Sequence, residues 1–182
     1  PGNNPFRTDS EQRASGGLDL LYRVTSNMTL NATINPDFGQ VEVDPAVVNL
    51  GVYETFFEEK RPFFIEGSEI FDFGRNTSGG RLFYTRRIGR PPQGSASGDY
   101  VLSPQFTTIL GAAKLSGKTA DGWSLGILDA VTGRESARWS TGEDWGRTQV
   151  EPLTNYFVAR VFRDADRAGY GGLFTAVNRD LG

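Results

Sequence analysis

Apolar and polar side chains alternate with a period of two residues near the beginning of the chain. Residues 17–25 and 28–35 both show this pattern, and Ser26 and Asn27 between them suit a tight turn. The apolar positions of the two segments are Leu18, Leu20, Tyr22, Val24, Met28, Leu30, Ala32 and Ile34. The pattern therefore predicts an antiparallel β-hairpin.

The same alternation predicts two further hairpins. One runs from Thr107 to Thr132 around the turn GKTADG, and the other joins residues 156–163 to residues 170–177 through DADRAG. Gly171 and Gly172 thin the last strand, as glycines in sheets do at bends or close approaches. Altogether the alternation predicts six strands in three hairpins.

The segment between the first and second hairpins has neither strand nor helix periodicity. It contains NPDFGQVEVDPAVVNLGVYETFFEEKRPFFIEGSEIF, residues 35–71, in which charged and aromatic side chains are mixed. A loop this long inside a compact domain is uncommon and is usually either functional or disordered. Because its many Phe, Val and Ile side chains argue against disorder, we expect a functional inserted segment over residues 36–106, hereafter the insert.

Two architectures fit the alternating strands. In a soluble β-sandwich the apolar face packs against a second sheet, and the aromatic residues belong to the core or the edges. In a transmembrane β-barrel the apolar face meets lipid between aromatic girdles, and the polar face lines a wet lumen. The strand ends carry the aromatic residues Tyr22, Trp123, Tyr156 and Tyr170. The alternation alone leaves both architectures open.

Several ordered motifs carry a resemblance to a known family. They are NPDFGQVEVDPAVVNL, YETFFEEKRPFFIEGSEIF, RLFYTRRIGR, GAAKLSGKTADGWSLGILDAVTGRE, NYFVARVFRD and GGLFTAVNRDL. In this order they closely resemble bacterial outer-membrane proteins whose C-terminal barrel is classed as domain of unknown function 5916. The resemblance covers nearly the whole chain and implies an all-β, antiparallel up-and-down transmembrane β-barrel segment in the bacterial outer membrane, with a long plug-like loop.

The resemblance also sets an expected domain organisation. We expect residues 1–16 to be a flexible lead-in from a longer chain, and residues 17–182 to be part of one barrel domain with the insert in its lumen. Six strands make an incomplete barrel, because a closed bacterial barrel needs at least eight. Members of this family typically carry an upstream domain similar to carbohydrate-binding module family 9, which is not identifiable in these residues.

Composition narrows the chemistry. The chain has no Cys and no His, so it can form neither a disulfide, a thiol nucleophile, a Ser-His-Asp triad nor an ordinary zinc site. Carboxylate chemistry remains open, including a calcium site at Asp37, Glu42 and Asp44, but the spacing of these residues does not match the EF-hand loop. We predict no catalytic residue, no cofactor and no metal site. The formal net charge of -3 offers no bulk attraction to nucleic acid, which we do not expect as a partner.

Charge is segregated within the insert. Nine acidic residues and only two cations lie from Asp37 to Asp72, whereas five arginines and no acid lie between Gly74 and Gly98. Two segments of opposite sign can pair inside one cavity, where an ion pair persists only when both partners are present. The predicted lumenal ion-pair network comprises Glu54, Glu58, Glu59, Lys60, Arg61, Glu66, Arg86 and Arg87.

Aromatic side chains flank these charges, and a solvated loop would not expose so many rings without a wall or a local core to bury them. Phe56, Phe57, Phe63 and Phe64 are the predicted aromatic anchors. A local core is favoured over an aromatic sugar-binding surface. Many nominal carboxylate pairs could serve glycoside hydrolysis, but acids beside basic residues are more often structural, so an enzymatic role of this segment is not favoured.

The sequence thus favours an outer-membrane β-barrel segment that takes part in the passage or handling of a solute, with a saccharide among the candidates. Outer-membrane lipid and lipopolysaccharide are its expected partners, and the oligomeric state stays open. Two alternatives remain. One is a membrane-anchored carbohydrate-binding or carbohydrate-processing protein whose active module lies upstream, and the other is a soluble β-sandwich binding domain.

Overall fold

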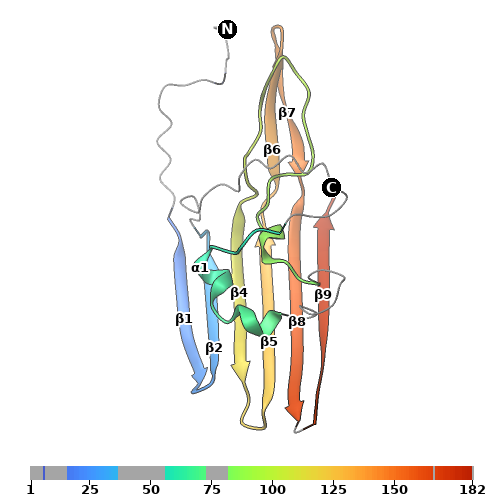
Figure 1. The fold of residues 1–182 in the computed structure, drawn as a ribbon. Helices are drawn as coiled ribbons and strands as arrows, with labels where there is room; N and C mark the ends of the chain where they lie inside the picture. The colour runs from blue at the N-terminus through green and yellow to red at the C-terminus, as the bar shows by residue number, and fades with distance from the viewer. Residues whose placement is uncertain (1–5, 7–15, 37–55, 73–81, 166, 182) are drawn as a thin grey trace.

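The computed structural model describes residues 6, 16–36, 56–72, 82–165 and 167–181. Within these residues the chain is all-β, with antiparallel strands in two sheets and three short helical turns (Figure 1). The predicted all-β, antiparallel class is confirmed. Of the predicted site residues, Glu54 lies outside the described residues.

A six-stranded sheet forms the main body of the described chain. Its strand order is β1-β2-β4-β5-β8-β9, and each neighbouring pair is antiparallel. These strands are β1 (Leu18–Thr25), β2 (Met28–Ile34), β4 (Ile109–Lys118), β5 (Trp123–Thr132), β8 (Leu153–Ala165) and β9 (Ala168–Asp180). They form the three predicted hairpins, although β8 and β9 are several residues longer than the alternation indicated.

A three-stranded sheet lies beyond one end of the main sheet, and the alternation did not predict it. It consists of β3 (Tyr100–Leu102), β6 (Glu135–Thr141) and β7 (Asp144–Glu151), in the order β3-β6-β7. Gly133 and Arg134 separate β5 from β6, and Pro152, which has no backbone N–H to donate, separates β7 from β8. The hairpin of β6 and β7 therefore continues outward from the paired strands β5 and β8 (Figure 1).

Three short helical turns belong to the insert. They are α1 (Pro62–Ile65) and the 3-10 helices η1 (Ser68–Phe71) and η2 (Thr85–Arg87). Pro62 suits the first position of α1 because its fixed φ is already helical and an N–H is not needed there. Gly67, at φ 65°, turns the chain between α1 and η1. No helix among the described residues is long and apolar enough to cross a bilayer.

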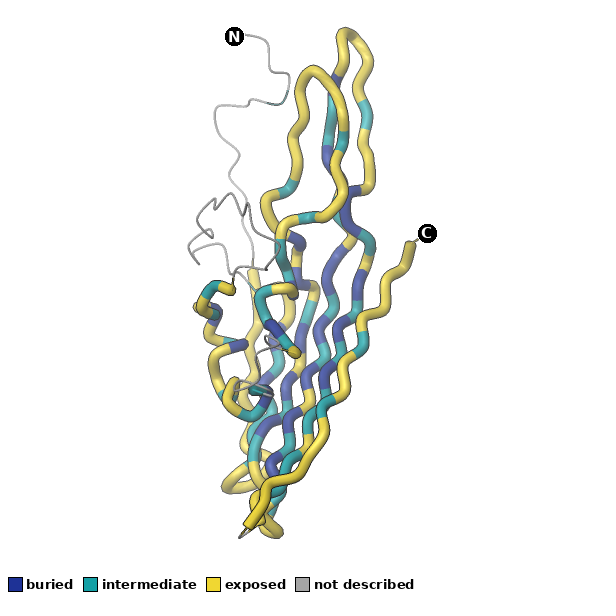
Figure 2. The backbone as a smooth tube through the Cα atoms, turned by 45° about the vertical axis from the view of Figure 1, so that its right-hand side comes forward, coloured by how far each residue is buried: buried dark blue, intermediate teal, exposed yellow. Residues whose placement is uncertain are grey.

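Strand alternation gives the main sheet two faces of different chemistry. The covered face, against which the described parts of the insert pack, includes Asn31, Thr33, Ala112, Lys114, Ser116, Ser124, Leu128, Ala130, Thr132, Thr154, Tyr156, Val158 and Arg160. The open face includes Leu20, Tyr22, Leu30, Ala32, Ile34, Ala113, Leu115, Leu125, Ile127, Val131, Phe157, Ala159, Val161, Phe174 and Ala176. The insert lies on one side of the sheet (Figure 2).

The hydrophobic core lies between the insert and the middle of the covered face. Phe64, Phe71 and Ile88 of the insert are buried there together with residues of β4, β5 and β8. The sheet contributes Ile109, Ala112, Leu128, Ala130, Tyr156 and Val158 to this cluster. Gly126 allows the close approach of η1, because a Cβ at this position would lie 2.8 Å from Ile70 Cγ2. The apolar core is thus a patch within a covered face that is otherwise largely polar.

Candidate functional site

The insert is tied to the covered face by three polar side chains from three different strands. Asn31 of β2 donates a hydrogen bond to the Glu66 carboxylate at 2.8 Å. Lys114 of β4 donates to backbone carbonyl groups at the end of α1. Arg160 of β8 donates to the carbonyl of Ile70 in η1 at 2.5 Å. The strands therefore hold the insert by its backbone as well as by its side chains.

Lys114 has the most demanding environment of the three. Its side chain is 1% exposed, and its ammonium group donates to the carbonyl oxygens of Phe63 and Glu66. The ammonium also lies 5.0 Å from the centre of the Phe63 ring. A buried charge is tolerated only where it is paired or hydrogen-bonded, and these carbonyls would otherwise lack intrahelical donors. Lys114 and α1 therefore stabilise each other.

A second network orders the segment before α1. Arg61, only 9% exposed, makes a bidentate ion pair with Glu59, with N–O distances of 2.8 and 2.7 Å. Its guanidinium also donates to the carbonyl oxygens of Ile88 at 2.6 Å and Thr85 at 3.0 Å. It lies 4.2 Å from the centre of the Phe64 ring. This one side chain therefore connects α1 to η2 and the core.

The carboxylate of Glu59 is fully engaged. Besides Arg61, it accepts a hydrogen bond from the Thr85 hydroxyl at 2.6 Å. Burial alone raises the pKa of the Glu59 carboxyl, but the hydrogen bonds and charge of Arg61, together with the Thr85 hydroxyl, outweigh burial and hold the pKa below its usual value. A carboxylate that stays ionised and saturated with donors is suited to structural support and not to proton transfer.

Tyr84 joins the two described parts of the insert. Its hydroxyl accepts a hydrogen bond from the backbone N–H of Phe57 at 2.8 Å and donates one to the carbonyl of Phe57 at 3.2 Å. Its ring meets that of Phe56 edge to face at 5.0 Å between centres. Arg86 adds a hydrogen bond of 2.6 Å to the carbonyl of Glu58. The segment before α1 therefore lies along the segment that contains η2.

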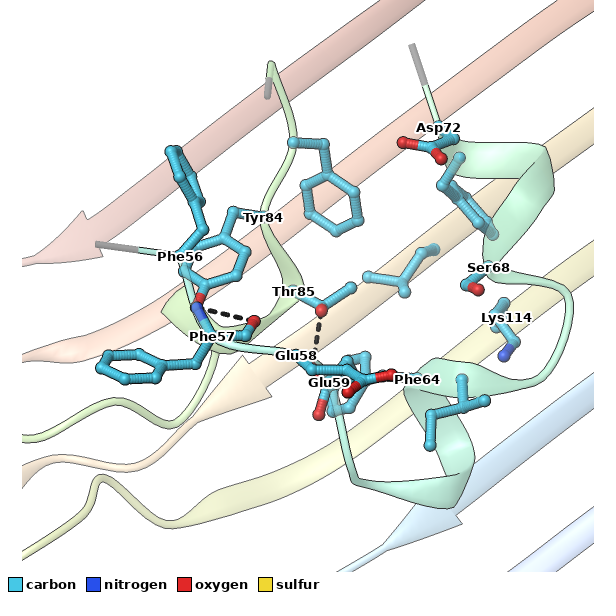
Figure 3. Close-up of a pocket in the computed structure, with 14 residues that line it drawn as sticks. Phe56, Phe57, Glu58, Glu59, Phe64, Ser68, Asp72, Tyr84, Thr85 and Lys114 are labelled. Carbon is cyan, nitrogen blue, oxygen red and sulfur yellow. Dashed lines mark hydrogen bonds between the residues drawn. The ribbon is translucent and has the colours of Figure 1, made fainter. Parts of the chain in front are cut away.

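A cavity of about 480 Å³ lies between these segments and the sheet (Figure 3). Its lining combines the rings of Phe56, Phe57 and Phe83 with the carboxylates of Glu58 and Asp72. Rings beside hydrogen-bonding groups can bind a solute that has both apolar and hydroxylated surfaces, as sugars do. Among the described residues, no group of three or more His, Cys, Asp or Glu side chains is arranged to hold a metal ion.

The predicted site residues take different positions. Of the four predicted aromatic anchors, Phe64 is buried, Phe57 and Phe63 are half-buried, and Phe56 is exposed. The predicted charged residues Glu59 and Arg61 pair with each other, whereas the carboxylate of Glu66 meets Asn31. The others that the structure describes, Glu58, Lys60, Arg86 and Arg87, lie at or near the surface of the insert.

Sequence reasoning missed the side chains through which the sheet holds the insert, Asn31, Lys114 and Arg160. One signal could have indicated them. Each is a polar residue on the face of an alternating strand that points away from the apolar band, and Lys114 lies in the otherwise small and apolar run GAAKLSG.

Comparison with known protein families shows a match over most of the chain. The family model described as domain of unknown function (DUF5916) matches residues 2–164. Searches among curated proteins and among solved structures found no match to the chain. Since the family model spans most of the sequence, this chain belongs to the family described as domain of unknown function (DUF5916).

Proposed function

We propose that this chain forms part of the wall of a bacterial outer-membrane β-barrel, with the open face against lipid and the part of the insert that carries α1, η1 and η2 inside the lumen as a constriction to solute passage. The observation that carries this proposal is the polarity of the main sheet. Its open face is apolar, whereas its covered face carries Asn31, Lys114, Ser124, Thr132 and Arg160 beside the apolar patch. A sheet of a soluble protein buries its apolar face and leaves its polar face in water. In this sheet the apolar face is open and the largely polar face is covered by the insert, as in a transmembrane barrel.

Exposure of the open face supports the same proposal. Ile127 is 41% exposed and Phe174 is 61% exposed, although both lie in the middle of their strands. Monomeric soluble proteins rarely expose a continuous apolar patch of more than a few hundred Å². Each large apolar side chain gains about 1.5–3 kcal/mol on leaving water. Lipid contact would therefore stabilise this face substantially.

Aromatic and polar side chains limit the apolar part of the open face. Trp123 and Tyr170 meet edge to face at 5.7 Å near one end, and Asn155 donates a hydrogen bond to Asp129 at 3.0 Å toward the other. From Trp123 to Asp129 the strand spans roughly 20 Å at its usual rise per residue. A barrel tilt of about 40° reduces this to about 15 Å along the membrane normal, which is shorter than the apolar band of about 25 Å in such barrels, so the kind of residue at each limit supports the proposal and the length of the band does not.

The covered face suits a wet lumen. The side-chain oxygen atoms Asn31 Oδ1 and Thr33 Oγ1 are buried without a hydrogen-bond partner in the described part of the chain. Buried polar atoms of this kind usually bind ordered water. On the same face of the sheet, the cavity lined by rings and carboxylates supports passage or handling of a polar solute, and a saccharide matches that lining best.

Orientation follows from the lengths of the connections. The connections from β1 to β2, from β4 to β5 and from β8 to β9 are only two to four residues long, whereas the insert and the hairpin of β6 and β7 leave from the opposite strand ends. Outer-membrane barrels have short periplasmic turns and longer extracellular loops. The insert therefore enters the lumen from the extracellular side. In lipid, the outer edges of β1 and β9 must each pair with another strand, because an open edge would leave backbone groups unsatisfied.

Spin-label accessibility tests the lipid contact. Single substitutions Ile127→Cys and Leu128→Cys in the full-length protein place labels on opposite faces at neighbouring positions. We expect high oxygen collision and low contact with a water-soluble nickel reagent at position 127, and low oxygen collision at position 128. Low oxygen collision at both positions, or release of the protein from membranes by carbonate wash, would contradict the barrel.

Single-channel recording tests the constriction. Deletion of residues 43–73 removes α1 and η1 from the proposed lumen and should raise conductance in planar bilayers. Unchanged conductance would contradict the role in passage while leaving the barrel intact, and would favour a barrel that serves only as an anchor. The spin-label test can therefore refute the lipid contact, and the conductance test can refute the constriction, each without the other.

A further inference from the structure

The three-stranded sheet carries two neighbouring rows of side chains on one face. Cross-strand register places Tyr100, Ser140 and Trp145 in one row, and Leu102, Arg138 and Arg147 in the next. Adjacent rows on one face of a sheet are about 7 Å apart, since they are separated by two residues along the strand. Aromatic rings and guanidinium groups therefore lie side by side on this surface, hereafter the hairpin face.

Trp145 is the most exposed large hydrophobic residue of the described chain, at 79%. The other tryptophan of this hairpin, Trp139, lies on the opposite face, where its indole N–H donates to the Thr148 hydroxyl at 3.1 Å and its ring packs over Gly146. Trp139 therefore has a structural explanation. No contact within the described residues gives Trp145 a structural role, and an exposed indole is typical of a binding surface.

The two arginines face each other directly across the strand pair. Like charges in directly opposed positions of a sheet destabilise it. Within the described residues no carboxylate pairs with Arg138 or Arg147. Arg138 lies 5.2 Å from the ring of Phe6, a contact that uses the guanidinium face and leaves its in-plane N–H donors available. An anion between the two forks would remove the repulsion and could accept bidentate hydrogen bonds from each.

The opposite face of this sheet carries different side chains. Val101, Ala137, Trp139 and Thr148 lie on it, and Ala137 is buried. Backbone contacts hold neighbouring segments at the edges of the strands: the N–H of Gly94 donates to the carbonyl of Val150 at 2.8 Å, and Gly98 lies close to the backbone of Ser140. Both arginines of the strand pair therefore lie on the hairpin face, together with the exposed indole of Trp145.

We propose that the hairpin face binds an anionic saccharide. A sugar ring stacks on Trp145 beside Tyr100, and a phosphate or carboxylate substituent of the same or the next sugar reaches Arg138 and Arg147. The spacing of about 7 Å between the rows matches the distance from a stacked ring to a substituent on it or on its neighbour. This inference rests on the three-stranded sheet alone and holds whether or not the main sheet faces lipid.

Calorimetric titration of the full-length protein in mild detergent tests the proposal. The probe is a deacylated, phosphorylated oligosaccharide prepared from lipopolysaccharide, compared with the same oligosaccharide after phosphate removal, with inorganic phosphate and with intact lipopolysaccharide. We expect the phosphorylated oligosaccharide to bind, and Trp145→Ala and Arg147→Ala each to weaken binding at least tenfold. Arg147→Lys keeps the positive charge but loses the planar guanidinium donors, so its loss of binding affinity should lie between those of the wild type and Arg147→Ala.

Arg167→Ala, in the exposed turn between β8 and β9, is the matched control and should bind as the wild type does. Circular dichroism of each variant establishes that the sheet is intact. If an alanine variant misfolds, the binding affinity of the conservative variant Arg147→Lys still tests the role of the guanidinium. Binding of intact lipopolysaccharide as well as the oligosaccharide supports a membrane headgroup, and binding of the oligosaccharide alone supports a free saccharide. Equal binding of the dephosphorylated oligosaccharide, equally tight binding of inorganic phosphate, or binding of intact lipopolysaccharide alone would overturn the proposal.

Discussion

Substitution of Lys114 by Met should release the insert from the sheet. Met keeps most of the side-chain volume against the Phe63 ring but removes the ammonium group that donates to two carbonyl oxygens. A hydrogen bond to a charged group contributes about 1.5–3 kcal/mol, and its loss leaves the buried carbonyl groups without this donor. Burying the lysine ammonium costs desolvation free energy in the wild type, and the Met variant avoids this cost, which offsets part of the loss of the hydrogen bonds. The expected net loss is about 3 kcal/mol in the free energy of opening the insert.

Tryptic cleavage in the insert measures this opening. Lys60 is exposed at the surface and Arg61 is followed by Pro62, so cleavage after Lys60 reports release of the segment. When opening and closing are fast relative to cleavage, the rate follows the open population. A loss of about 3 kcal/mol then gives roughly 100-fold faster cleavage, at 1.4 kcal/mol for each factor of ten.

The matched control is Lys118→Met, on the same face and strand but at its exposed end. Its cleavage rate should stay within about twofold of the wild type, because an exposed substitution changes stability by less than about 0.5 kcal/mol. Equal cleavage rates in the Lys114→Met and Lys118→Met variants would refute the anchoring role of Lys114.

Three further predictions concern other contacts of the insert. The folded-state pKa of Glu59 is lowered, so the ionised carboxylate stabilises the protein fully at pH well above the usual glutamate value of about 4.3, and this stabilisation is lost as pH falls through the folded-state pKa. Protection from pepsin should therefore weaken over that acidic range, and Glu59→Gln should flatten the profile, whereas an unchanged profile would exclude Glu59 as its source. Gly126→Ala adds a Cβ 2.8 Å from a carbon of η1 and should lower the free energy of unfolding in urea by about 1–3 kcal/mol. Gly172→Ala is the control, because a Cβ at Gly172 meets nothing within 4 Å. An equal effect of the two substitutions would disprove the packing explanation. Tyr84→Phe removes two hydrogen bonds to the backbone of Phe57 and should cost about 1–2 kcal/mol by the same measurement, with no change as the contrary result.

Period-two alternation was sufficient to predict the three hairpins of the main sheet, but not the pairing of one hairpin with the next. In β2, β4 and β5, nearly every second residue is apolar on one side and polar or small on the other, and short turns leave little freedom in pairing. The hairpin of β6 and β7 escaped prediction for a physical reason. Arg138 and Arg147 occupy one of its faces, so no apolar stripe distinguishes the hairpin from a polar loop.

The insert was harder to predict in detail than in outline. Charge segregation indicated pairing between its acidic and basic segments, yet Glu59 pairs with Arg61 only two residues away. Local geometry selects this pair, because the Thr85 hydroxyl donates a hydrogen bond to Glu59 and the carbonyl of Ile88 accepts one from Arg61. The position of Lys114 in an apolar run could have marked it as unusual, but its acceptors are backbone carbonyls, which every residue has, so the sequence does not show which of them Lys114 meets.

The hydrogen bond from Arg160 to Ile70 has a consequence for the order of folding. Its two residues are 90 positions apart, and Arg160 belongs to a strand synthesised long after the insert. Contacts of such separation form late, since loop closure opposes them until the intervening structure exists. We therefore expect the insert to reach its final protease-resistant position only after β8 has paired with β5. Pulse proteolysis during refolding would reject this order if protection of the insert preceded formation of that strand pair.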